Sequence, residues 1–104
     1  MNPMEIFRQE APGVAKAFDD LIQSLIDSKG LDEKTKQLIY IAMKAAQGDE
    51  TAVKFHVQMA IKLGAAKREV VDAILMTLTV AGLKGVVTCL PGAVKEFEGQ
   101  FSKN

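Results

Sequence analysis

The sequence has few of the residues from which reactive sites are commonly built. Its 104 residues include one cysteine, Cys89, one histidine, His56, and no tryptophan. A single cysteine excludes a disulfide within the chain and a zinc site built from several cysteines. The histidine has no second histidine or glutamate at the helical spacing of a metal-binding pair, and there is no glycine-rich phosphate-binding loop. We therefore expect neither a metal nor a cofactor.

The chain also lacks an excess of charge of either sign. Thirteen Lys and Arg residues balance 13 Asp and Glu residues, so the formal net charge is zero. Nucleic-acid binding requires excess positive charge to displace counterions from phosphates, and attraction to an anionic membrane surface requires the same excess. We expect neither partner. The N-terminus, Met1–Glu5, has no basic segment followed by an apolar one, so we expect a cytoplasmic protein.

Long apolar runs are scarce, although the total apolar content is high. The most apolar stretch, residues 73–94, is long enough to span a bilayer, but Lys84 lies in its middle, where a charge costs about 2.5–3.5 kcal/mol. Gly82, Gly85 and Pro91 also interrupt it, and we expect two buried helical segments there. Hydrophobic residues make up 48% of the chain, and the 8 glycines bring the apolar count to 58 of 104 residues. Ordinary domains lie at about 45–50% on that count, so the chain has more apolar surface than one small subunit easily buries, which predicts a homo-oligomer.

Helical patterns cover the chain, and no stretch shows the sustained alternation typical of a strand. Asn2, Asp32 and Asp49 are suited to N-cap positions, and Glu69 is the only residue that compensates for the poor cap at Ala66. The sequence predicts a single all-α domain over residues 1–104, a compact bundle of five to six helices. We expect these helices over residues 3–9, 12–28, 33–47, 50–63, 67–83 and 85–100.

The side chains that suggest chemistry are His56 and Cys89. Helical spacing places His56 on one face with Ala52, Met59, Ala60 and Leu63, and we expect that face to be buried. Two interpretations of His56 remain open: a hydrogen-bonded histidine in the core or an interface, or a general acid and base at the wall of a pocket. For Cys89, in an apolar segment without a well-spaced cation, we expect an inert buried thiol.

Residues 31–94 resemble the carboxymuconolactone decarboxylase family, which includes the AhpD-like alkylhydroperoxidases. The most specific part is the spacing His-x₃-Ala-x₃-Gly-Ala, present as His56, Ala60, Gly64 and Ala65. The resemblance implies small all-α subunits that assemble into trimers or hexamers and act on a small molecule. It is also carried by Leu31–Ile39, Phe55–Ala65, Arg68–Ala73 and Ala81–Gly82.

The family has two branches, and the resemblance assigns His56 a role in both. The AhpD-like branch resembles a thiol peroxidase built on Cys-x-x-Cys-x-x-x-His, with a glutamate as proton relay. In this chain the two cysteine positions fall on Asp49 and Ala52, and the glutamate position falls on Gln37. A peroxidase would therefore have to use Cys89 with an external thiol.

The decarboxylase branch resembles a cofactor-free enzyme that removes CO₂ from a carboxylated muconolactone. For this reaction we expect His56 to act as the general acid and base, and Gln37 and Arg68 to bind the substrate. A guanidinium can bind a carboxylate through two hydrogen bonds, which favours Arg68 over other cations. A third possibility is an inactive oligomeric binding module. The rival cations are Lys54, Lys62 and Lys84.

Overall fold

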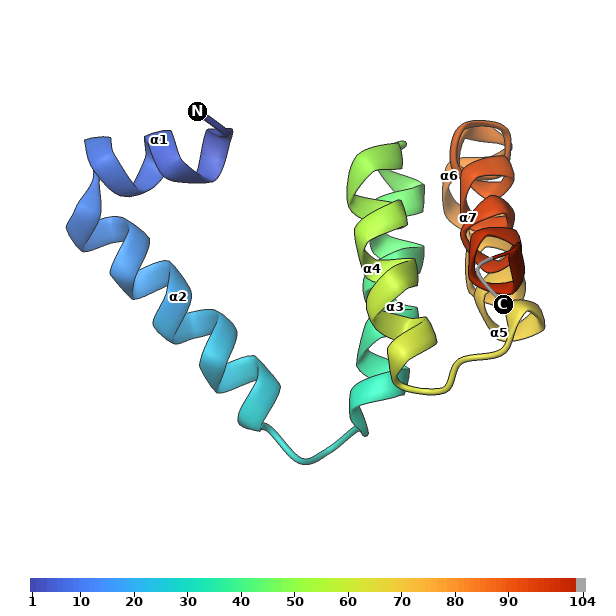
Figure 1. The fold of residues 1–104 in the computed structure, drawn as a ribbon, viewed down its shortest axis with the longest axis horizontal. Coiled ribbons are helices and arrows are strands. Elements are labelled where there is room, and N and C mark those ends of the chain that lie inside the picture. Colours follow the sequence, from blue (N-terminus) through green and yellow to red (C-terminus); the bar gives the residue numbers. More distant parts are fainter. Residues whose placement is uncertain (103–104) are drawn as a thin grey trace. The chain divides into compact units, whose positions relative to one another are not determined.

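A computed structural model describes the backbone of residues 1–102 and the side chains of residues 1–98. Every regular element in these residues is a helix (Figure 1). The prediction of an all-α fold is therefore confirmed. The chain divides into two compact units, of which the first is Met1–Leu31 and the second begins at Asp32. They are described separately below, and the prediction of a single domain stays a prediction.

The first unit is a pair of helices, α1 (Pro3–Glu10) and α2 (Pro12–Asp27). The Asn2 side chain caps α1 by accepting a hydrogen bond from the backbone N–H of Glu5 at 2.9 Å. The rings of Phe7 and Phe18 meet edge to face, with centroids 6.2 Å apart. One stripe of α2 stays exposed although it is apolar: Val14, Phe18, Leu21, Leu25 and Ile26.

The second unit contains α3 (Glu33–Ala46), α4 (Glu50–Lys62), α5 (Lys67–Leu75), α6 (Leu78–Ala81) and α7 (Lys84–Ser102). The predicted caps are confirmed, since Asp32 accepts from the N–H of Thr35 at 2.7 Å and Asp49 from that of Ala52 at 3.1 Å. Glu69 compensates for the poor cap of α5 as expected. Its carboxylate accepts from the N–H of Ala66 at 2.8 Å and lies 3.1 Å from the Lys34 ammonium, which joins the starts of α3 and α5.

The predicted continuous helix over residues 67–83 is wrong. The helix ends at Leu75, and the short α6 follows after Met76 and Thr77. The buried Thr77 hydroxyl donates to the carbonyl of Ile74 at 2.6 Å, and such a local bond competes with the regular helical pattern. Gly82 then ends α6 with φ of 61°, a value that glycine adopts at little cost.

The apolar stretch over residues 73–94 is consequently shared by α5, α6 and α7. Within the described part of the chain, no helix is both long enough and apolar enough to cross a membrane. The expectation that this stretch is buried holds only in part, because α6 and the turns beside it lie at the surface of the isolated chain. Its exposed large apolar side chains are Leu75, Met76, Leu78, Val80, Leu83 and Val87.

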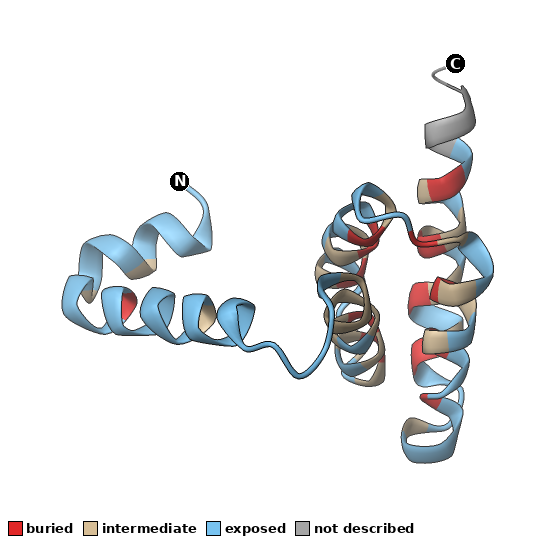
Figure 2. Cartoon of the chain, turned by 90° about the horizontal axis from the view of Figure 1, so that it is seen from below, coloured by how far each residue is buried: buried red, intermediate tan, exposed pale blue. Residues whose placement is uncertain are grey.

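The core of the second unit lies where α3 and α4 face α5 and α7 (Figure 2). The largest fully buried side chains there include Ile41 of α3, Val53 and Val57 of α4, and Ile74 of α5. From α7 comes one stripe of residues four apart. This α7 stripe consists of Gly85, Cys89, Ala93 and Phe97.

Candidate functional site

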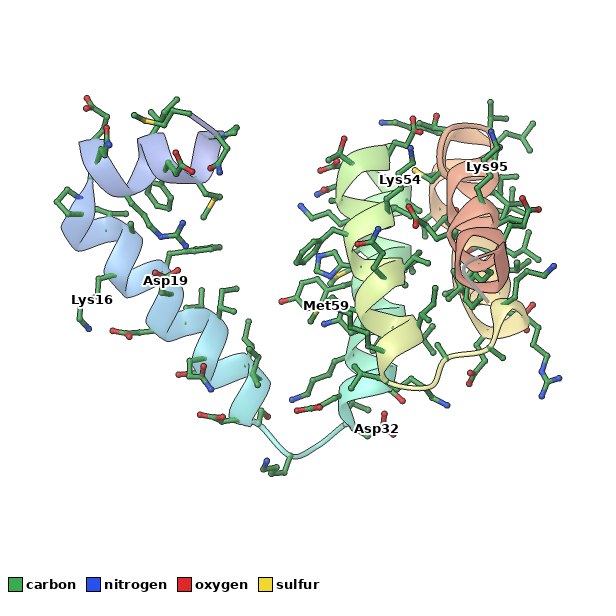
Figure 3. The ribbon with its side chains drawn as sticks, in the orientation of Figure 1. Lys16, Asp19, Asp32, Lys54, Met59 and Lys95 are labelled. Carbon is green, nitrogen blue, oxygen red and sulfur yellow. The ribbon has the colours of Figure 1, made fainter. Side chains whose placement is uncertain are left out.

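His56 lies in the middle of α4, at the border between its buried and exposed faces. The fully buried row of α4 is Val53, Val57 and Ala60. The expected burial of the face around His56 is wrong in part, since Met59 and Leu63 keep 37% and 38% of their surface exposed. Figure 3 shows Met59 on the side of α4 away from α7. Because α4 packs against both α3 and α7, only the row between those two helices is sealed.

Three side chains orient the half-buried imidazole. Its Nδ1 lies 2.8 Å from Oε1 of Gln37 on α3. The ring of Tyr40, one turn further along α3, stacks on it with centroids 5.0 Å apart and planes 5° from parallel. Phe55 meets it edge to face at 5.3 Å. The structure thus brings together two of the predicted site residues, Gln37 and His56, from different helices.

The other ring nitrogen, Nε2, makes no hydrogen bond to any residue within the part of the chain that the structure describes. Large apolar side chains that stay exposed form an apolar surface on α3 and α4, the helices that carry Gln37 and His56, and Phe55 of this surface contacts the ring. This surface consists of Ile39 and Met43 on α3 and Phe55, Met59 and Leu63 on α4. A nitrogen beside such a surface can meet a small, largely apolar ligand that carries a few polar groups.

The environment lowers the pKa of His56 below the ordinary value for histidine. The main cause is burial, which disfavours the charged imidazolium, and the positive charge of Lys44 acts in the same direction. Asp49, at the start of α4, acts in the opposite direction with a smaller effect. The ring is therefore neutral at neutral pH and is able to accept a proton.

Lys44 is the functional candidate that the sequence interpretation missed. It follows Gln37 by seven residues and Tyr40 by four, so all three share one face of α3. It is partly buried, and it is the cation whose charge acts on His56. The sequence shows that Gln37, Tyr40 and Lys44 share a face of α3. Only the contact between Gln37 and His56 shows that this is the face directed toward His56.

None of the cations favoured by the sequence has an interaction with His56 within the described residues. Arg68 is exposed in the first turn of α5, a helix that packs against α3 and α7, and its charge acts on neighbouring Glu69. Lys54 faces α7, because its ammonium pairs with Glu50 at 3.2 Å and its stem lies beside Gly92. The Lys84 side chain packs against Gly48, and Lys62 is exposed in the last turn of α4.

Cys89 is buried, as expected. It belongs to the core, has 1% of its surface exposed, and forms no disulfide. Burial raises the pKa of its thiol, and the negative charges of Glu50 and Asp49 raise it further. These effects disfavour the reactive thiolate. No group of three or more His, Cys, Asp or Glu residues in the described part of the chain is placed to hold a metal ion.

Comparison with known proteins gives a consistent result. The model of the carboxymuconolactone decarboxylase family matches residues 12–94. Among curated proteins, MJ1511 and MJ0742 of Methanocaldococcus jannaschii, both uncharacterised, are each 30% identical to the chain. The MJ1511 match covers 77% of this chain and 75% of that protein, and the MJ0742 match covers 77% and 78%.

Two crystal structures resemble the chain in fold. One is apo-lpg0406, a carboxymuconolactone decarboxylase family protein of Legionella pneumophila, with a TM-score of 0.79 and 29% identity over 92% of this chain and 85% of that one. The other is a candidate carboxymuconolactone decarboxylase of Burkholderia xenovorans LB400, with a TM-score of 0.87 over 99% and 83%. The second likeness concerns the fold alone, because the identity is 20%.

Proposed function

Since the chain belongs to the carboxymuconolactone decarboxylase family, we propose that it is an acid–base enzyme that decarboxylates a small carboxylated lactone without a cofactor. The observation that carries this proposal is the environment of His56. One ring nitrogen is held by Gln37 at 2.8 Å, the other makes no hydrogen bond within the described residues, and the ring contacts Phe55, an exposed apolar side chain. Because the ring is only half-buried, this second nitrogen is available to a ligand.

The chemistry requires one proton and a place for one negative charge. The bond between the carboxylate carbon and the lactone breaks, CO₂ leaves, and the electron pair is delocalised into the lactone carbonyl as a dienolate. His56, which has first taken up a proton from water and become an imidazolium, delivers that proton to carbon and returns to its neutral form. A lowered pKa suits this role, because it makes the imidazolium a stronger proton donor once formed.

Lys44 is our proposed cation for the substrate carboxylate. Its charge acts on His56, which places it in the electrostatic environment of the ring. Arg68 is the alternative cation favoured from the sequence, and Gln37, which was predicted to bind the substrate, is the hydrogen-bond partner of His56. Replacing Lys44 by Met should raise KM for a carboxylated substrate about tenfold or more, as loss of a charged hydrogen bond implies. The same effect from Arg68→Met, with Lys44→Met unchanged, would assign the role to Arg68.

The decisive experiment measures CO₂ release from a carboxylated muconolactone by the wild type and by His56→Gln. We expect turnover by the wild type and a loss of at least about 100-fold in the variant, the usual contribution of a general acid or base. Size-exclusion chromatography of both proteins shows whether the assembly survives. Full turnover by His56→Gln, or no turnover of any carboxylated lactone by the wild type, contradicts the proposal.

The two other functions considered are separable by direct assays. A peroxidase that uses Cys89 would consume hydroperoxide with an external thiol and lose this activity in Cys89→Ser, but burial and the raised thiol pKa disfavour it. An inactive binding module would show ligand-induced stabilisation in a thermal-shift screen without conversion of the ligand.

We also propose that the protein works as a homo-oligomer, a trimer or a hexamer. The support is the amount of apolar surface that one chain leaves exposed, including the apolar stripe of α2, the surface beside His56 and the large side chains around α6. Exposed apolar surface of this extent is typical of subunit interfaces. Sedimentation equilibrium gives the subunit number, and a monomer at all concentrations contradicts the proposal.

A further inference from the structure

The contact between His56 and Gln37 determines which ring nitrogen carries the proton. The atom of Gln37 that faces the ring is Oε1, 2.8 Å from Nδ1. An amide oxygen only accepts hydrogen bonds, so Nδ1 must be the donor. In the neutral ring the proton then resides on Nδ1, and Nε2 carries the lone pair.

We propose that Gln37 is a positioning residue that holds His56 in the Nδ1–H tautomer, so that Nε2 is the atom that exchanges a proton with the ligand. The tautomer assignment stands on the hydrogen bond alone. The assignment of proton exchange to Nε2 rests on the function proposed above. An unrestrained histidine side chain in water favours the opposite tautomer, Nε2–H, so the contact must select the less favoured form.

Tyr40 and Gln37 fix two different aspects of the orientation of the His56 ring. Tyr40 stacks on the imidazole with planes 5° from parallel, which fixes the plane of the ring. Stacking alone does not distinguish the ring from one flipped by 180° about its Cβ–Cγ bond, because the flip leaves the plane unchanged. The hydrogen bond does distinguish them, since it requires Nδ1 to face Gln37 on α3. The edge of the ring that carries Nε2 is thereby turned away from the Gln37 side chain.

The uncharged side chain of Gln37 acts on the ring differently from the glutamate that could occupy the same position. An amide carries no charge in the pH range where histidine titrates, so its oxygen accepts the hydrogen bond from Nδ1–H without adding the negative charge that would strongly favour an imidazolium. The charged groups that act on the ring are Lys44 from α3 and Asp49 from α4, and the stacked Tyr40 is the other titratable group that contacts it. A carboxylate at residue 37 would favour the charged ring and raise the pKa of His56.

The experiment exploits the fact that the chain contains one histidine. Protein labelled with ¹⁵N-histidine and carrying no histidine tag gives one pair of imidazole nitrogen resonances, and two-bond ¹⁵N–¹H correlation spectra above the titration range identify the protonated nitrogen. We expect Nδ1–H in the wild type. In Gln37→Leu, which cannot accept, the ratio of Nδ1–H to Nε2–H should fall about fivefold or more, as the loss of one ordinary hydrogen bond implies.

Two further variants make the test specific. Gln37→Glu keeps an acceptor, so it should retain Nδ1–H while the His56 titration moves to higher pH. Gln58→Leu is the matched control, because Gln58 lies on the same helix as His56 but bonds to Glu96 of α7 at 3.2 Å. It should leave the tautomer unchanged. A shifted ratio in this control would mean that the effect follows any loss of a glutamine from this region, and it would overturn the inference.

The outcomes separate this inference from the proposed function. An Nε2–H wild type, or a ratio unaffected by Gln37→Leu, overturns the role of Gln37 whether or not the protein has decarboxylase activity. If the spectra show the expected tautomers but the protein does not turn over any carboxylated lactone, the proposed function is refuted and the positioning role of Gln37 stands. The spectra are recorded on ligand-free protein, so neither result depends on finding the substrate.

Discussion

A methyl group added at Gly85 tests the packing that places α3 against α7. Gly85 is buried near the start of α7, and a Cβ there would lie 2.7 Å from the carbonyl oxygen of Ala45 and 2.8 Å from Oγ1 of Thr77. Ordinary contacts of a Cβ begin at 3.4 Å. The carbonyl belongs to the backbone of α3, and the hydroxyl is held by its bond to Ile74. Neither is the free end of a flexible side chain, so the helices themselves must move apart.

The magnitude follows from two opposing effects. Alanine is favoured over glycine by up to about 1 kcal/mol inside a helix, and less near its first turn. Overpacking of a well-packed site costs about 1–3 kcal/mol. We expect Gly85→Ala to lower the free energy of unfolding by about 1–2 kcal/mol, which for a chain of this size corresponds to a fall in Tm of roughly 4–12 °C.

Gly92→Ala is the matched control in the same helix. Its Cβ would lie 2.8 Å from Cε of Lys54, the mobile end of a long side chain that can move aside. This variant should be unchanged or slightly more stable, because it gains helix propensity without displacing backbone. Urea denaturation and thermal melts of the three proteins, at one fixed protein concentration, measure the difference. Equal or higher stability of Gly85→Ala relative to Gly92→Ala refutes the packing argument.

Three further predictions concern the core and the titrating groups. Ile41→Ala removes a fully buried side chain of α3 and should cost about 2–5 kcal/mol in urea denaturation; a cost below 1 kcal/mol would show that the site is not tightly packed. Because the pKa of His56 is lowered in the folded state, the unfolded chain binds more protons just below the ordinary histidine value of about 6.5. Stability should therefore fall as the pH drops through that window, and His56→Gln should reduce the slope; equal slopes contradict the cause assigned. Cys89 should react with a thiol reagent in urea but hardly at all in the native protein, as measured by mass spectrometry, and rapid native labelling would show that the thiol is accessible.

Local signals explain why most helix boundaries could be predicted from the sequence. Asp32 and Asp49 cap the helices that they were expected to cap, and both helices start where predicted. A cap is an interaction between residues two or three positions apart, so it is readable without tertiary contacts. The break after Leu75 was missed because it depends on Thr77, which is buried only when α7 packs against it. Threonine in an apolar run does not by itself end a helix.

The candidate site was predictable only in part. His56 and Gln37 were both identified from the sequence, but the contact between them depends on how α3 packs on α4. Nineteen residues separate Gln37 from His56, and no local rule joins them. Lys44 was missed for the same reason, since its relevance follows from the face of α3 that Gln37 defines.

The α7 stripe has its smallest side chain at one end and its largest at the other, and this difference has a mechanical consequence. Gly85, Cys89, Ala93 and Phe97 are four residues apart, and four residues in a helix advance by 400°, so the row winds slowly around the axis. The neighbouring helices therefore pack against a hydrogen atom at Gly85 and a phenyl ring at Phe97. Deleting one residue between Gly85 and Phe97 would rotate the bulky end by about 100° relative to the small one. The length of this segment should therefore be invariant among relatives, even where its amino acids change.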